Sequence, residues 1–243
     1  MLLYAASTLR RRHARTEWSR SLDVALVLVR DGPIDPGALE ALRARVPALE
    51  EKLTAELHRY RGAPDRPFRF VVRGPVELHA PRPEPAGEGT FDLAKHAWAL
   101  WRWTARLDEA AALDTGAYDA RVYVVLKAPA TATRRFVEGA SEQGGRIGML
   151  EVDLDASMVD FALFVTTHEL LHTIGALDKY GPDGNARIPD GLGDPEAHPL
   201  FPQTLAEPMA RGRVIAPGRE EPPDSLEMLR VGKATAREIG WID

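Results

Sequence analysis

Two histidines and a glutamate with the spacing of a metal site stand in the stretch Thr167–Tyr180, "THELLHTIGALDKY". His168 and His172 are four residues apart, so on an α-helix both imidazoles lie on one face and can hold one metal ion. Glu169 lies about 100° further round the helix, where it can reach a water on that metal but is badly placed to be a ligand. These residue types predict a zinc hydrolase with Glu169 as general base.

A catalytic zinc ion needs a third protein ligand, and the same stretch offers one. Gly175 tolerates a positive φ and can turn the chain back after the helix. Asp178 follows three residues later with a carboxylate oxygen, a ligand that suits Zn²⁺. His198 and Glu207 are alternative third ligands, and Tyr180 can approach the metal or the transition state. We predict that Asp178 is the ligand.

The alternative interpretation is a solvated helix that carries two histidines by chance. The residues from Phe161 to Val165, "FALFV", are apolar and predict a largely buried helix. Buried histidine and glutamate side chains need partners, because burying an unpaired polar group costs roughly 2–7 kcal/mol. A metal ion would supply such a partner, which favours the metal site.

The elements that must position this motif follow the order of an α/β domain. Runs rich in β-branched residues predict strands over Leu22–Val29, Phe68–Arg73, Arg121–Leu126 and Arg146–Leu154, with a short exposed strand within Arg135–Ala140. We therefore expect a twisted, mostly parallel sheet with one antiparallel edge strand. The proline-rich segment from Pro75 to Gly89 is expected to be a loop.

Three helices are expected to accompany these strands. An apolar stripe from Leu39 to Leu57 predicts one helix, which Pro47 either kinks or divides. Phe91–Leu113 predicts a second helix, and the motif helix starts near Asp155 or Ser157 and ends at Gly175. The second helix carries three tryptophans that we interpret as core residues: Trp98, Trp101 and Trp103.

The chain after Gly175 is rich in glycine, proline and aspartate up to Pro223, and a helix over Leu226–Ile239, which Gly232 can divide, follows. We predict one catalytic domain over 21–243, with an upper subdomain over 21–175 and a lower one over 176–243. Residues 1–20 are expected to be a frayed arm or the remnant of a leader. An acidic cluster could bind Ca²⁺, but its spacing favours a solvated loop: Asp183, Asn185, Asp190 and Asp194.

Composition excludes several classes of site and partner. The 243 residues include no cysteine, so disulfides, thiolate metal ligands and a cysteine nucleophile are excluded. A formal net charge of −5 gives no reason to expect a nucleic-acid partner. No apolar run is long enough to span a bilayer.

The motif resembles the signature of the metzincin zinc peptidases, HExxHxxGxx followed by a third ligand that is usually histidine and in some groups aspartate. Here the pattern reads His168, Glu169, His172, Gly175 and Asp178. The aspartate form resembles the snapalysins and the immune-inhibitor-A-type peptidases. This resemblance implies one catalytic Zn²⁺ ion, a peptide or protein substrate, and an active-site helix followed by an irregular lower subdomain with a final helix.

Metzincins also carry a downstream turn whose methionine lies beneath the metal, and "LAEPMARG" offers Met209 for that place. Met228 is disfavoured because it falls in the predicted last helix. Arg211 stands two residues after Met209, where some metzincins have a tyrosine, so no tyrosine switch is carried over. The family implies that the strand within Arg135–Ala140, or its neighbour, aligns an extended peptide. It also implies an exported or envelope-associated protein, although "MLLYAAS" is too short for a signal-peptide core and a cytoplasmic location stays open.

Two other functions fit the same ligands. One is a metal-bearing binding or structural domain without catalysis, against which Glu169 argues, since a structural zinc is normally closed by a fourth protein ligand. The other is a zinc hydrolase of a non-peptide amide, which the motif does not separate from a peptidase.

Overall fold

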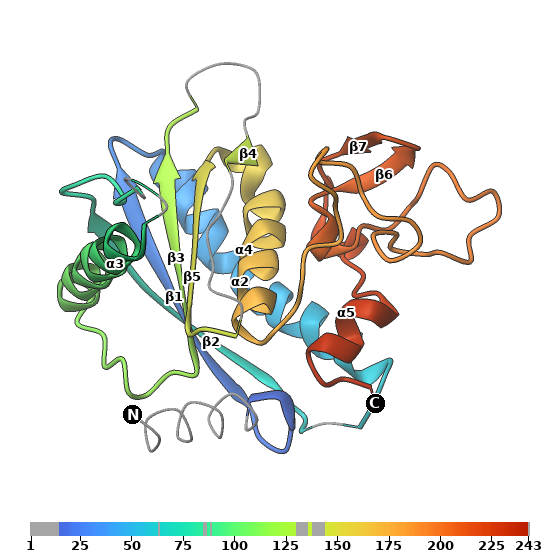
Figure 1. Ribbon diagram of the computed structural model, residues 1–243, viewed down its shortest axis with the longest axis horizontal. Coiled ribbons are helices and arrows are strands. Elements are labelled where there is room, and N and C mark those ends of the chain that lie inside the picture. Colours follow the sequence, from blue (N-terminus) through green and yellow to red (C-terminus); the bar gives the residue numbers. More distant parts are fainter. Residues whose placement is uncertain are drawn as a thin grey trace.

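The computed structural model describes residues 15–62, 64–84, 87, 89–129, 136–137 and 144–242. A five-stranded sheet with the order β2-β1-β3-β5-β4 forms the centre of the upper part (Figure 1). Its strands are β1 (Leu22–Asp31), β2 (Phe68–Glu77), β3 (Ala120–Lys127), β4 (Phe136–Val137) and β5 (Ile147–Asp153). All pairs are parallel except β4 with β5, so the predicted α/β class and the antiparallel edge strand are confirmed.

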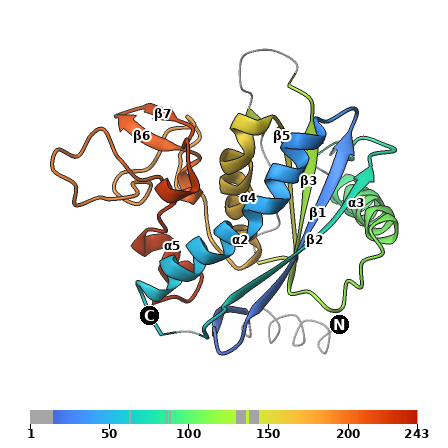
Figure 2. The same cartoon turned by 180° about the vertical axis from the view of Figure 1, so that it is seen from behind.

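Helices cover both faces of this sheet, as Figures 1 and 2 show. Helices α2 (Pro36–His58) and α4 (Val159–Thr173) lie on one face, and α3 (Thr90–Ala110) lies on the other. Strand β1 is buried on both sides, and its side chains alternate between two cores. Val24, Leu26 and Leu28 join the core of α2 and α4, whereas Ala25, Val27 and Val29 join that of α3.

Helix α2 runs without interruption from Pro36 to His58, with Pro47 inside it. Asp35 caps its start by accepting a hydrogen bond from the Gly37 amide at 3.0 Å. Of the two arrangements expected at Pro47, division into two helices is therefore wrong. The buried leucine stripe confirms the predicted inner face of this helix.

Strand β2 continues through Pro75 to Glu77, where the sequence predicts a loop, so that boundary is wrong. Because β2 is an edge strand, the missing amide hydrogen of Pro75 interrupts no central ladder. The register with β1 shifts between Val27 and Val29, and Gly74 there has a φ of 86°. A bulge at Gly74 thus lets the strand resume after the proline.

Two of the three tryptophans expected in the core are exposed. Trp98 and Trp101 are 56% and 63% exposed, whereas Trp103 is 6% exposed and donates its indole N–H to the Ala80 carbonyl at 2.9 Å. Helix α3 contacts the sheet through the side that carries Trp103 and Leu107, so residues on its other side face outward. Leu93, near the start of α3, is also exposed.

Beyond α4 the chain forms the irregular lower part at the right of Figure 1. Its elements are the 3₁₀ turn η2 (Pro208–Ala210), the hairpin of β6 (Arg213–Ala216) and β7 (Arg219–Glu221), the turn η3 (Leu226–Met228) and helix α5 (Lys233–Glu238). The predicted division at Gly232 is confirmed, whereas the hairpin has no counterpart in the prediction. Met209, Leu229 and Ile239 join the core that contains α4.

The start of the described chain is packed against the core, contrary to the expectation of a frayed arm up to residue 20. Trp18 is 3% exposed, and its indole N–H donates to the Ile239 carbonyl at 2.8 Å. Its ring contacts those of Phe68 and Trp241 at centroid distances of 5.1 and 5.9 Å. Residues 1–14 and most of Arg135–Ala140 lie outside the described residues. No helix in the described ranges combines the length and apolar character needed to cross a bilayer.

Candidate metal centre

Helix α4, which carries the motif, is almost entirely buried. Every residue of α4 is buried except Asp160 and His172. Asp155 starts the preceding 3₁₀ turn, Ala156–Met158, by accepting from the Ser157 amide at 2.7 Å. Asp160 then pairs with Arg45 of α2 at 2.8 Å, which fixes the beginning of α4 against its neighbour. The helix is thus a rigid support for its last turn.

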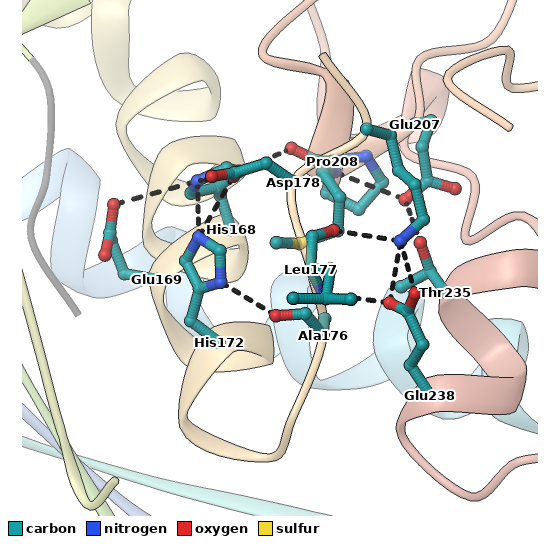
Figure 3. Close-up of polar contacts among 12 residues, drawn as sticks. His168, Glu169, His172, Ala176, Leu177, Asp178, Glu207, Pro208, Thr235 and Glu238 are labelled. Atoms are coloured by element: carbon teal, nitrogen blue, oxygen red, sulfur yellow. Dashed lines mark hydrogen bonds and ion pairs between the residues drawn. The ribbon is translucent and has the colours of Figure 1, made fainter. Parts of the chain in front are cut away.

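The last turn ends as the sequence predicts. Gly175 has a φ of 116°, a conformation that favours glycine, and its amide donates to the His172 carbonyl at 3.0 Å. The Ala176 amide donates back to the Leu171 carbonyl at 3.0 Å. This reversal brings Asp178 alongside the two histidines that precede it on the helix (Figure 3).

Three ligand atoms from His168, His172 and Asp178 converge in this place. The Nε2 atoms of His168 and His172 are 3.0 Å apart. Oδ1 of Asp178 lies 3.4 Å from Nε2 of His168 and 3.2 Å from Nε2 of His172. Ligands bound tetrahedrally to zinc at about 2.0–2.1 Å are separated by about 3.3–3.4 Å. The three separations therefore fit one zinc ion with a fourth position left over.

The hydrogen bond of each Nδ1 decides which nitrogen of the neutral ring is free to bind a metal. Nδ1 of His168 lies 2.9 Å from the Pro208 carbonyl oxygen, and Nδ1 of His172 lies 2.9 Å from that of Ala176. A carbonyl oxygen only accepts, so each Nδ1 carries a hydrogen. In the neutral form of each ring, Nε2, which faces Asp178, is then the nitrogen that is free to bind a metal. Hydrogen bonds of this kind orient metal-bound histidines.

Electrostatics at the site also favour a cation. Oδ1 of Asp178 is buried and has no hydrogen-bond partner of good geometry among the described residues. Burial lowers the pKa of His168 to about 4, so this imidazole is neutral at pH 7. Burial opposes charge on His172 and Asp178 as well, but several contacts together outweigh it. The pKa of the imidazole is raised by Asp178 and the Ala176 carbonyl, and the pKa of the carboxyl is lowered chiefly by the two histidines. A metal ion would satisfy all three groups.

Glu169 lies beside this group and outside it. Its side chain is almost fully buried, and Oε1 is 3.9 Å from Nε2 of His168. Strand β5 permits this position because Gly148 packs directly on the helix, where a β-carbon would lie 3.0 Å from the Glu169 carbonyl oxygen. The carboxylate is thus close to the converging ligand atoms without being one of them.

Turn η2 supports the site from the lower part of the chain. Met209, the methionine singled out in the sequence, is fully buried in this turn, and its carbonyl accepts from the Lys179 amide at 2.7 Å. The neighbouring Pro208 carbonyl is the acceptor for His168. The turn thereby holds both the first histidine and the segment after Asp178.

The two alternative third ligands lie elsewhere. His198 is exposed and outside the converging group. Glu207 is fully buried and serves the fold, since its carboxylate accepts from the Met209 amide, the Gly232 amide and the Thr235 hydroxyl. Burial raises the pKa of Glu207 to about 7.

The acidic loop considered for calcium does not gather into a metal site among the residues described. Asp183 accepts from the Asn185 amide at 3.1 Å and from its side-chain amide at 2.8 Å. Asp194 similarly accepts from the Glu196 amide at 3.1 Å. These carboxylates close local turns of the backbone, as the solvated-loop interpretation expects.

Tyr180 lies next to the converging ligands. Its ring lies nearly parallel to that of His168, with centroids 6.4 Å apart and an interplanar angle of 19°. A hydrogen bond from Tyr180 is among the contacts that lower the pKa of Asp178. The guanidinium of Arg211 lies over the Tyr180 ring, 4.9 Å from its centroid. The predicted place of Tyr180 near the site is thus observed, while its role in catalysis stays a prediction.

Comparison with known proteins gives little further information. No protein-family model matches the chain, and no curated protein matches it. Among solved structures, it is similar to archaemetzincin from Methanopyrus kandleri, with 21% identity over 68% of this chain and 78% of that one, at a TM-score of 0.36. A likeness of this extent leaves the chemistry of the site to the residues themselves.

Proposed function

We propose that the protein is a zinc-dependent endopeptidase. The observation that carries this proposal is the convergence of His168, His172 and Asp178 with the separations of a three-ligand zinc site, beside the buried carboxylate of Glu169. Three protein ligands with an open fourth position are typical of catalytic zinc, whereas structural zinc is usually closed by four.

The ligands and the base would have separate tasks. His168, His172 and Asp178 would hold one zinc ion, which when bound lowers the pKa of a water toward about 7 and polarises the scissile carbonyl. Glu169 accepts the proton of the attacking water at its carboxylate and returns it to the leaving amine. The apolar surroundings of α4 limit access of bulk water to this carboxylate.

The substrate we infer is an extended peptide. Strand β4 ends the strand order of the sheet and pairs antiparallel with β5, the strand that packs against the motif helix through Gly148. A substrate could therefore add to β4 by backbone hydrogen bonds. A peptide bound along β4 would present its scissile bond to the residues on α4.

The test compares purified wild-type protein with Glu169→Gln. We expect about one zinc ion per chain in both proteins, and hydrolysis of an unstructured polypeptide about 10²–10⁴-fold slower in the variant, because only the base is removed. His198→Ala is the matched control and should retain both properties. Zinc bound without hydrolysis of any peptide in a diverse library would instead point to a metal-bearing domain without peptidase activity.

A further inference from the structure

Glu238, the last residue of α5, contacts the chain on both sides of Asp178 (Figure 3). Its Oε2 accepts from the Leu177 amide at 2.9 Å. Its two oxygens also lie 2.8 and 2.7 Å from Nζ of Lys179. Since Leu177 and Lys179 flank Asp178 directly, one carboxylate from the end of the chain holds both neighbours of the third ligand.

Lys179 completes this clamp. Its ammonium also donates to the Leu177 carbonyl at 2.9 Å, and its backbone amide donates to the Met209 carbonyl at 2.7 Å. The residue is 5% exposed, and a lysine is rarely so buried unless it is paired. The ion pair therefore ties the ligand segment to α5, and the backbone amide of Lys179 ties it to turn η2.

Asp178 is the most exposed of the three proposed ligands. Its side chain is 40% exposed, compared with 7% for His168, which lies on α4. The segment after Gly175 is also irregular, so its geometry depends on such tertiary contacts and not on helical hydrogen bonds.

We propose that Glu238 is a positioning residue for the metal centre and that α5 sets the affinity of the site for zinc through the third ligand. This inference rests on the proposed function in that it requires His168, His172 and Asp178 to bind a metal. It goes further because it assigns a role in metal retention to Glu238. This residue lies 59 positions after Lys179 and touches no ligand atom itself.

The experiment measures zinc affinity by competition with a chromophoric chelator, at a temperature where circular dichroism shows each variant to be folded. Glu238→Ala removes every contact of the clamp carboxylate and should weaken zinc binding about 10–100-fold, the usual effect of losing an outer-sphere partner. Glu238→Gln retains an acceptor for the Leu177 amide but not the charge, so its loss should be smaller.

Asp108→Asn is the matched control. Asp108 forms a similarly buried ion pair with Arg121, and also accepts from the Tyr123 hydroxyl at 2.6 Å, but on the sheet face that carries α3. The zinc affinity of the Asp108→Asn variant should equal that of wild type, even though the fold loses stability. Zinc affinity of Glu238→Ala within twofold of wild type, or an equal loss in Asp108→Asn, would overturn the inference. Failure of wild type to bind zinc would instead overturn the proposed function.

Discussion

Replacing Asp178 by alanine should remove one of the three zinc ligands while leaving the histidines in place. The histidines are held by α4 and by the Pro208 and Ala176 carbonyls, none of which depends on the Asp178 side chain. A complete four-ligand structural zinc site is worth about 10–16 kcal/mol, so one ligand is worth about 3 kcal/mol. That energy corresponds to an affinity about 100-fold lower.

Thermal unfolding with and without zinc measures this loss. At a zinc concentration 100 times the wild-type Kd, bound metal stabilises the wild type by about 2.7 kcal/mol, whereas a variant with 100-fold weaker binding gains only about 0.4 kcal/mol. For a domain of this size these energies raise Tm by about 5–11 °C and about 1–2 °C, respectively.

His198→Ala serves as the control, because His198 is exposed and lies outside the converging group. It should show the full wild-type shift in Tm on addition of zinc. If Asp178→Ala kept the full shift and His198→Ala lost it, the assignment of the third ligand would be wrong.

Three further predictions concern the support of the site and the fold. Burial opposes the charge of Asp160 more than any single contact favours it, but the hydrogen bonds from Arg45 and the Leu226 amide and the charge of Arg45 together lower the pKa of this carboxyl. Its contribution to stability is therefore present above the ordinary pKa of 3.8 and is lost as pH falls through the lowered value. Asp160→Asn should accordingly flatten the acid unfolding curve followed by circular dichroism. Gly148→Ala places a β-carbon 3.0 Å from the Glu169 carbonyl oxygen. Displacing the base in this way should lower kcat about tenfold, while zinc content measured by mass spectrometry is unchanged. In urea unfolding, Trp98→Ser should change stability by less than about 0.5 kcal/mol, whereas Trp103→Ala should cost about 3–5 kcal/mol.

The convergence of the site was predictable because its ligands are close in sequence. Four-residue spacing on a helix, a glycine that permits reversal and an aspartate three residues later form a local unit, and the structure brings those groups together. The supporting contacts were not predictable, because they join distant residues. Nothing in the sequence pairs Glu238 with Lys179 or turns the Pro208 carbonyl toward His168.

Prediction of the fold failed where a local signal had two interpretations. Helix α3 has apolar residues on two sides, and its sequence alone does not say that Trp103, and not Trp101, meets the sheet. Gly74 and Pro75 usually end a strand, yet at an edge a bulge absorbs both and β2 continues. The central strands β1 and β3 were easier to predict, since each buries an uninterrupted apolar run.

Removal and return of zinc tests the central claim most directly. Wild-type protein treated with a chelator and freed of it by dialysis should lose hydrolysis of an unstructured polypeptide, and one equivalent of zinc should restore it. The same cycle on Glu169→Gln should restore the zinc content and no hydrolysis. Undiminished hydrolysis by the metal-free wild type, or equal hydrolysis by the zinc-loaded variant, would contradict a zinc peptidase that uses Glu169 as its base.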